Sequence, residues 1–147
     1  MLSVFGSSLE EVDQNREEIL RELESKLPLN GAREVVRFRI EWIITELLQN
    51  HCDHGNNRNP SKRISVDCDI TDDGIFLWDS SDEGGGFDPE SLPDPTDEDH
   101  IESDHGRGVY SIREMVMEQS RDGVQGVFEY PNGDRPLGSC VRVEMPI

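Results

Sequence analysis

The sequence predicts an α+β fold, a two-layer sandwich in which helices cover one face of a mixed, mostly antiparallel sheet. Two observations predict it: helical periodicity fills residues 9–50, and strand-like alternation with tight turns begins near residue 64. Runs of helices followed by hairpins favour this layered arrangement over a parallel βαβ fold. With 147 residues, the chain is most simply a single domain over residues 1–147.

The first half of the chain predicts a short strand and two helices. A weak strand pattern over residues 3–5 comes before Ser8-Leu9-Glu10-Glu11, which has the form of a capping box. The helix that this box starts should run from about residue 9 to 26, where Pro28 and Gly31 end the periodic segment. A second helix is predicted by apolar residues on one face, namely Val36, Ile40, Ile43 and Leu47.

The second half predicts hairpins around one further helix. Residues 51–61 have the composition of a loop, and strands over residues 64–70 and 75–78 are joined by the turn Asp72-Asp73-Gly74. Later elements are a helix from Val109, a strand over residues 127–130 and a closing strand that contains Val141, Val143 and Met145.

Charge and composition exclude several classes of function. The chain has 32 acidic and 14 basic residues, and the basic ones are scattered, so it lacks the basic patch that nucleic-acid binding needs. Cys52, Cys68 and Cys140 have neither disulfide nor zinc spacing, which indicates buried, reduced thiols. No leader or membrane-length apolar run is visible, so we expect a cytoplasmic protein without a membrane anchor.

An acidic segment interrupts the hairpins. Residues 82–104 are rich in Asp, Glu and Pro and contain no Lys or Arg, a composition typical of a mobile loop. A long loop inside a small domain is often a functional lid. We place this lid at about residues 88–105.

Polar and glycine-rich motifs flank this segment. Glu46 and Asn50 are four residues apart and share one face of the second helix. Asp82-Glu83-Gly84-Gly85-Gly86 follows the predicted hairpin, and Gly106-Arg107-Gly108 comes directly before the third helix. Magnesium prefers oxygen ligands, and backbone amides at a helix start bind phosphate. In this order, the motifs suggest an ATP site.

With these motifs, nearly the whole chain resembles the GHKL ATPase superfamily, which joins gyrase, heat-shock chaperone, histidine kinase and MutL domains. It looks most like the small anti-sigma factor serine kinases in that superfamily. The resemblance implies the histidine-kinase-like ATPase (Bergerat) fold and Mg²⁺ with ATP. The closing segment Gly138-Ser139-Cys140-Val141, with the alternation after it, also matches the last strand of the family.

The resemblance also implies roles for individual residues. Glu46 is expected to be the catalytic base, Asn50 to bind Mg²⁺ and ATP, and Asp82 to accept a hydrogen bond from the adenine amino group. Asp79 is an alternative candidate for the adenine contact. The other expected ATP-binding residues are His54, Gly84, Gly86, Phe87, Gly106, Arg107, Gly108, Val109 and Ser139.

Finer features favour one branch of the superfamily. Histidine kinases usually carry Lys where Asp53 stands, whereas His54-Gly55 resembles the anti-sigma kinases. That branch implies a Ser/Thr kinase that phosphorylates a STAS-type antagonist, controls a sigma factor and can form a homodimer. His51 departs from the family, where Ala is usual, and its ring would crowd or contact the phosphates. The alternatives are a non-catalytic ATP-binding module that regulates a partner, and a histidine-kinase-type ATPase domain.

Overall fold

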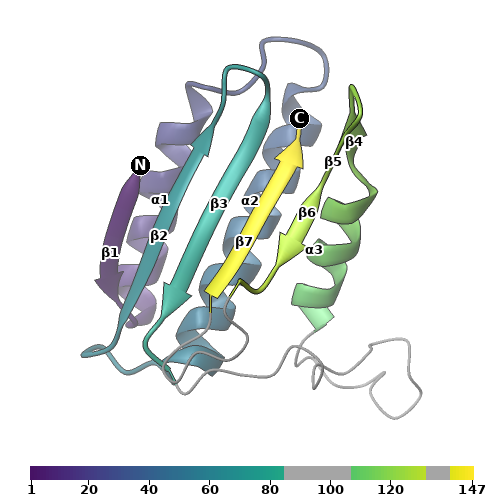
Figure 1. Ribbon diagram of the computed structural model, residues 1–147. Coiled ribbons are helices and arrows are strands. Elements are labelled where there is room, and N and C mark those ends of the chain that lie inside the picture. The colour runs from purple at the N-terminus through teal and green to yellow at the C-terminus, as the bar shows by residue number, and fades with distance from the viewer. Residues whose placement is uncertain (85–106, 132–139) are drawn as a thin grey trace.

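A computed structural model describes residues 1–84, 107–131 and 140–147 of the chain (Figure 1). The predicted lid at residues 88–105 therefore lies outside the described residues. In chain order the elements are β1 (Leu2–Gly6), α1 (Leu9–Glu24), α2 (Arg33–Asn50), a π-helical turn η1 (His51–Gly55), β2 (Arg63–Ile70), β3 (Ile75–Asp82), α3 (Arg107–Glu118), β4 (Ser120–Arg121), β5 (Val124–Gln125), β6 (Val127–Glu129) and β7 (Cys140–Pro146).

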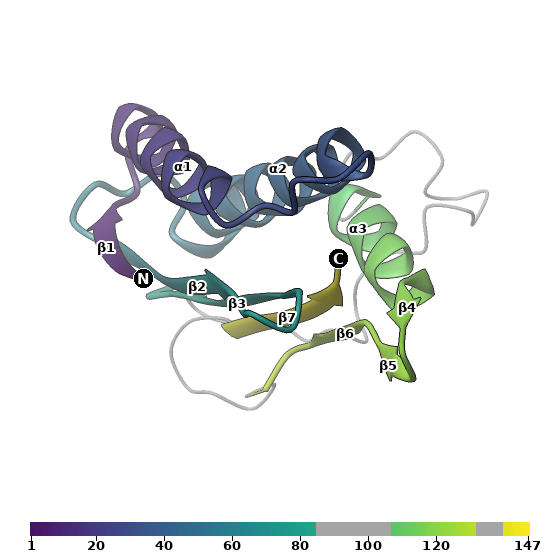
Figure 2. The same ribbon diagram turned by 90° about the horizontal axis from the view of Figure 1, so that it is seen from above.

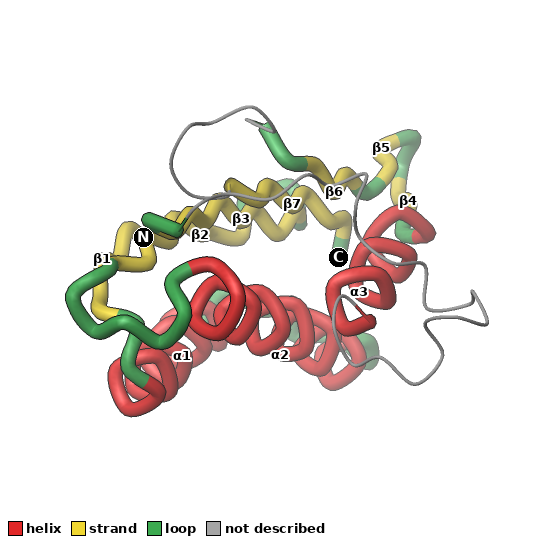
Figure 3. The backbone as a smooth tube through the Cα atoms, turned by 90° about the horizontal axis from the view of Figure 1, so that it is seen from below, coloured by secondary structure: helices red, strands yellow, loops and turns green. Residues whose placement is uncertain are grey.

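The fold has two layers, as the sequence predicts. Five strands form one sheet in the order β1-β2-β3-β7-β6, and the helices α1, α2 and α3 lie along one face of it (Figures 2 and 3). Every pairing between the described strands of this sheet is antiparallel, so the parallel component of the expected mixed sheet is not found among them. The other face of the sheet carries no helix in the described parts of the chain.

Ser8 caps α1 by accepting a hydrogen bond from the backbone N–H of Glu11, as the capping box predicts.

Apolar side chains at regular spacing hold the sheet and the helices together. Alternate residues of each central strand point toward the helices and bury their side chains there. These inward apolar residues are Ile64, Val66, Cys68 and Ile70 on β2, Phe76 and Trp78 on β3, and Val141, Val143 and Met145 on β7.

The structure confirms one boundary and corrects two. The hairpin was expected to end at the first glycine cluster, and β3 continues past Trp78 to Asp82, because its polar residues still pair with β2 and β7. His51–Gly55 was expected to be loop, but it continues α2 as a π-helical turn. The short hairpin of β4 and β5 was missed, since strands of two residues carry no readable alternation.

The three cysteines are free thiols. The expected burial is confirmed for Cys52 and Cys68 but is wrong for Cys140, which is partly exposed at the start of β7. Burial raises the pKa of the Cys68 thiol from 9.0 to about 11, and it also raises the pKa of the Cys52 thiol. Both buried thiols therefore stay protonated and unreactive at neutral pH. In the described residues, no helix has the length and apolar character needed to cross a bilayer.

Candidate nucleotide site

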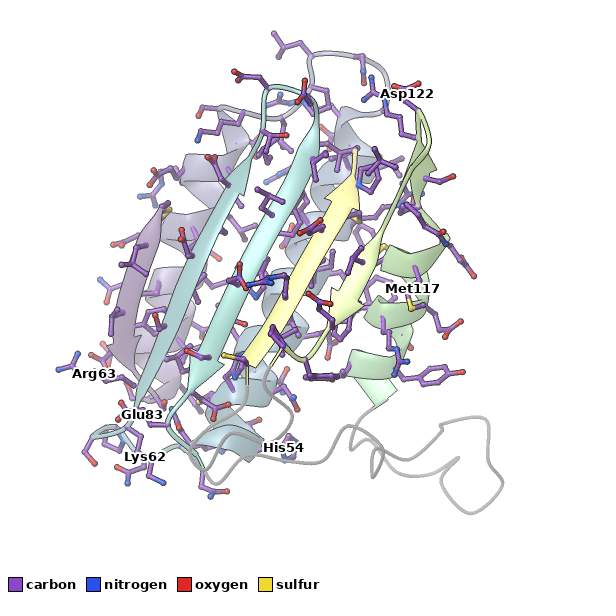
Figure 4. All side chains as sticks on the ribbon, viewed as in Figure 1. His54, Lys62, Arg63, Glu83, Met117 and Asp122 are labelled. Carbon is purple, nitrogen blue, oxygen red and sulfur yellow. The ribbon has the colours of Figure 1, made fainter. Side chains whose placement is uncertain are left out.

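The predicted motifs meet at one end of the sandwich. The carboxyl ends of α2 and β3 and the start of α3 all lie at the lower end of Figure 1. His54, Lys62, Arg63 and Glu83 are labelled at the same end in Figure 4. There the backbone N–H of Arg63 donates to Oε1 of Glu83 at 2.7 Å, which ties the start of β2 to the end of β3.

Glu46 meets the start of α3. A Cβ atom placed on Gly108 would lie 1.9 Å from Oε2 of Glu46 and 2.6 Å from its Cδ, so the carboxylate fills the space that any side chain at Gly108 would need. Glu46 is half-buried on α2, and Gly108 is in the first turn of α3. The backbone amides of that turn lack partners inside the helix. The structure thus brings the predicted base beside the predicted phosphate-binding turn.

Asn50 lies one helical turn after Glu46 and is also half-buried. It is the last residue of α2, after which the helix widens into the π-helical turn. π-Helical turns are rare and often occur at functional sites. Here the turn carries His51 inward, whereas His54 of the same turn is exposed.

Strand parity separates the two candidate aspartates. Trp78, Ser80 and Asp82 occupy alternate positions on β3 and all face the helices. Asp79 therefore points to the other face of the sheet, where its Oδ1 accepts a hydrogen bond from Nε of Arg142 at 2.9 Å. The structure thus places Asp82 on the side of Glu46 and Asn50, and Asp79 on the opposite side.

The Asp82 carboxylate is buried under two glycines. The backbone N–H of Gly84 donates to its Oδ1 at 3.0 Å. A Cβ atom on Gly55 would lie 2.1 Å from Oδ2 of Asp82, and one on Gly84 would lie 1.8 Å from the backbone oxygen of Gly55. Only glycine fits at these two positions, because the backbone of η1 and the end of β3 pack directly together.

His51 lies against Asp82. Its Nδ1 is 2.6 Å from Oδ2 of Asp82, and its Nε2 is 2.8 Å from Oγ of Ser80. The expectation that this ring would crowd or contact the phosphates is not supported by its position, because both ring nitrogens are committed to residues of β3. Sequence reasoning missed this contact, since it depends on how η1 packs on the sheet.

Asn56 is a further residue that the sequence did not single out. It is completely buried, and its Nδ2 donates to Oγ of Ser7 at 2.7 Å and to the backbone oxygen of Arg63 at 2.9 Å. Its Oδ1 accepts a hydrogen bond from the backbone N–H of Glu83 at 2.9 Å. One amide therefore joins the end of β1, the start of β2 and the end of β3 just before Gly84.

Replacing Asn56 with alanine is expected to lower the free energy of unfolding by about 1–3 kcal/mol, because buried donors and acceptors lose their partner. Urea denaturation would measure the change. Asn15→Ala is the matched control, since Asn15 is on α1 and its Nδ2 donates to the backbone oxygen of Glu11 in an exposed hydrogen bond. Equal stability of the two variants would show that Asn56 does not hold this end of the sheet together.

The remaining predicted residues have different environments. Val109 is buried in the hydrophobic core, so its contribution to a nucleotide site would be its backbone N–H in the first turn of α3. Arg107 begins α3. The positions predicted at Gly86, Phe87, Gly106 and Ser139 lie outside the described residues.

Comparisons with known proteins agree with this arrangement. A family model described as "Histidine kinase-like ATPase domain" matches residues 9–129. A comparison with curated proteins gave no match.

Two solved structures share the fold. The histidine kinase domain of the Erythrobacter litoralis EL346 blue-light activated histidine kinase aligns with a TM-score of 0.55 at 14% identity, covering 92% of this chain and 58% of that one. The mycobacterial sensor histidine kinase MprB aligns with a TM-score of 0.51 at 15% identity, covering 99% and 97%. The chain thus spans 58% of the length of the first of these structures.

Proposed function

Since the chain belongs to the family of histidine kinase-like ATPase domains, we propose that it binds Mg-ATP where α2 and β3 end and α3 begins. The observation that carries this proposal is the contact between Glu46 and Gly108, which puts a carboxylate beside the amides at the start of a helix. Such amides can bind a phosphate group. The adjacent carboxylate can act as a general base toward a nearby hydroxyl.

The residues present fit this ligand. The side-chain oxygen of Asn50 is a hard ligand of the kind that Mg²⁺ takes together with phosphate oxygens. Glycine at position 108 leaves room for the Glu46 carboxylate beside the first turn of α3, and glycine at positions 55 and 84 lets the backbones of η1 and β3 pack beside Asp82. Bound Mg-ATP would supply the phosphoryl group and neutralise part of the local negative charge.

We further propose that the reaction is phosphorylation of a Ser or Thr hydroxyl. Glu46 accepts the hydroxyl proton as the oxygen forms its bond to the γ-phosphorus and the bond to ADP breaks. The side-chain oxygen of Asn50 would bind Mg²⁺, and the carboxylate of Asp82 would accept a hydrogen bond from the adenine amino group. The amides of Gly108 and Val109 stabilise negative charge on the phosphates without needing a side chain.

A STAS-type antagonist is the proposed substrate, and a sigma factor is the proposed target that the chain controls. The resemblance to anti-sigma kinases supports this choice. Asp53 also supports it: where histidine kinases usually carry Lys, this carboxylate accepts a hydrogen bond from Nε of Arg58 at 2.7 Å. The side chain at that position is thus an acidic group paired with Arg58, in place of the cation usual in histidine kinases.

Affinity capture from the native cytosol with Mg-ATP tests the function, with bound proteins and phosphosites identified by mass spectrometry. We expect a STAS protein phosphorylated on Ser or Thr, with a phosphate that survives acid. Acid-labile phosphate would instead indicate transfer to His. Bound partners without ATP-dependent phosphorylation would favour a non-catalytic module that uses ATP to regulate its partner.

A further inference from the structure

We propose that His51 is a positioning residue for base recognition: it orients the Asp82 carboxylate and thereby sets the preference of the site for adenine. This inference rests on the proposed function, because it takes the ligand to be ATP. It concerns a buried ring whose two nitrogens both lie against side chains of β3. It also assigns a role to a buried polar group that the transfer step does not use.

The ring is held at both nitrogens. The distances are 2.6 Å from Nδ1 to Oδ2 of Asp82 and 2.8 Å from Nε2 to Oγ of Ser80. The side chains of His51 and Asp82 are only 2% and 1% exposed. Water therefore does not compete for these hydrogen bonds, and the ring has a single satisfied orientation.

The neighbours determine where the proton lies on the ring. Nε1 of Trp78 can only donate, and it lies 2.7 Å from Oγ of Ser80. The hydroxyl of Ser80 accepts that bond and keeps its own hydrogen for Nε2 of His51. Nε2 is then an acceptor, and the proton of a neutral imidazole is on Nδ1, where it donates to Asp82.

The ring of His51 and the backbone of Gly84 therefore both direct a donor toward Asp82. His51 donates to Oδ2, and the backbone N–H of Gly84 donates to Oδ1 at 3.0 Å. Hydrogen bonds to both oxygens favour the charged carboxylate, which accepts hydrogen bonds and cannot donate them. Such a group pairs with the exocyclic amino group of adenine and repels the carbonyl oxygen that hypoxanthine and guanine present at the same position.

Removal of the His51 donor should weaken this discrimination. A buried carboxylate that loses a hydrogen bond takes up a proton more readily. The protonated form carries an O–H group, which can donate to a base carbonyl. Inosine triphosphate has a 6-oxo group and an N1–H where ATP has a 6-amino group and an unprotonated N1. The preference for ATP over inosine triphosphate would then fall.

Two substitutions separate the two nitrogens of the ring. In His51→Asn the side-chain NH₂ takes the approximate place of Nδ1 and can still donate to Asp82. In His51→Gln the amide reaches the approximate place of Nε2, near Ser80, and the donor to Asp82 is lost. Both variants remove the ring, and the smaller Asn leaves the larger cavity, so a role in packing alone would impair His51→Asn at least as much as His51→Gln.

The measurement is the ratio of the Kd values for inosine triphosphate and ATP, determined by calorimetry in the presence of Mg²⁺. We expect the wild-type protein and His51→Asn to keep a strong preference for ATP. In His51→Gln the ratio of the two Kd values should fall about tenfold or more, as for a site that lacks one polar partner. An unchanged ratio in His51→Gln, or an equal loss in both variants, overturns the inference and leaves the proposed function standing. Failure of the wild-type protein to bind ATP overturns the proposed function itself.

A measurement on the wild-type protein covers the case in which the variants do not fold. Nitrogen NMR of ¹⁵N-histidine-labelled protein distinguishes the two neutral tautomers of each ring. We expect His51 to carry its proton on Nδ1 and its resonance to shift more with ATP than with inosine triphosphate. A proton on Nε2, or equal shifts with both nucleotides, contradicts the inference.

Discussion

The Glu46→Gln variant is expected to transfer phosphate about 10²–10⁴-fold more slowly than the wild-type protein, the range typical for removing a general base. Glutamine keeps the shape of the side chain against Gly108 but cannot accept a proton. Binding of Mg-ATP should remain, because the proposed metal ligand is Asn50 and the proposed base contact is Asp82. Single-turnover assays with the captured substrate give the rate, and calorimetry gives the affinity.

Glu41→Gln is the matched control for this experiment. Glu41 is also on α2 and is also half-buried, but it precedes Glu46 by more than one helical turn. We expect Glu41→Gln to leave the transfer rate unchanged. Loss of ATP binding in Glu46→Gln would assign Glu46 a structural role, and full activity in that variant would exclude it as the base.

Alanine at Gly108 is expected to lower the transfer rate by about 10²-fold, because a reacting group displaced by about 1 Å typically loses that much. The new Cβ would lie 1.9 Å from Oε2 of Glu46. Since a carboxylate at the end of a flexible side chain moves more easily than the backbone, the substitution should push Glu46 out of position. Rate measurements at saturating Mg-ATP test this.

The free energy of unfolding of Gly108→Ala should not fall together with its transfer rate. Alanine is a better helix former than glycine, so Gly108→Ala should leave the stability unchanged or raise it by up to about 1 kcal/mol. Gly31→Ala is the matched control, because a Cβ atom there meets nothing within 4 Å. A Gly108→Ala variant that is fully active would show that the Glu46 carboxylate need not stand beside the start of α3.

Most of the fold was predictable because it depends on local periodicity. Apolar spacing along residues 9–50 indicated α1 and α2, and alternation indicated β2 and β7. The same alternation also predicts the faces of the two aspartates. Asp82 is an even number of residues from Trp78 and shares its face of β3, whereas Asp79 is on the opposite face. Counting from the buried Trp78 would have separated the two aspartates without any structure.

The site was less predictable, because its contacts join segments that are distant in the chain. The motifs contain particular residue types in a particular order, and this was enough to suggest an ATP site. The chemistry of a carboxylate, an amide and a glycine turn depends on the residue type and on its local spacing. The contact between Glu46 and Gly108 depends on how α3 packs beside α2, and no local pattern encodes it.

His51 and Asn56 show most clearly the difference between what local sequence patterns predict and what packing decides. In the sequence both lie in a stretch with loop composition, and nothing about their neighbours separates a buried side chain from an exposed one. The π-helical turn carries His51 to Asp82, and Asn56 joins the ends of three strands. Such hydrogen bonds form only after the sheet and α2 have packed. Local periodicity thus determined the elements and the chemical class of the site, whereas packing between distant segments decided which polar groups are buried and what they bind.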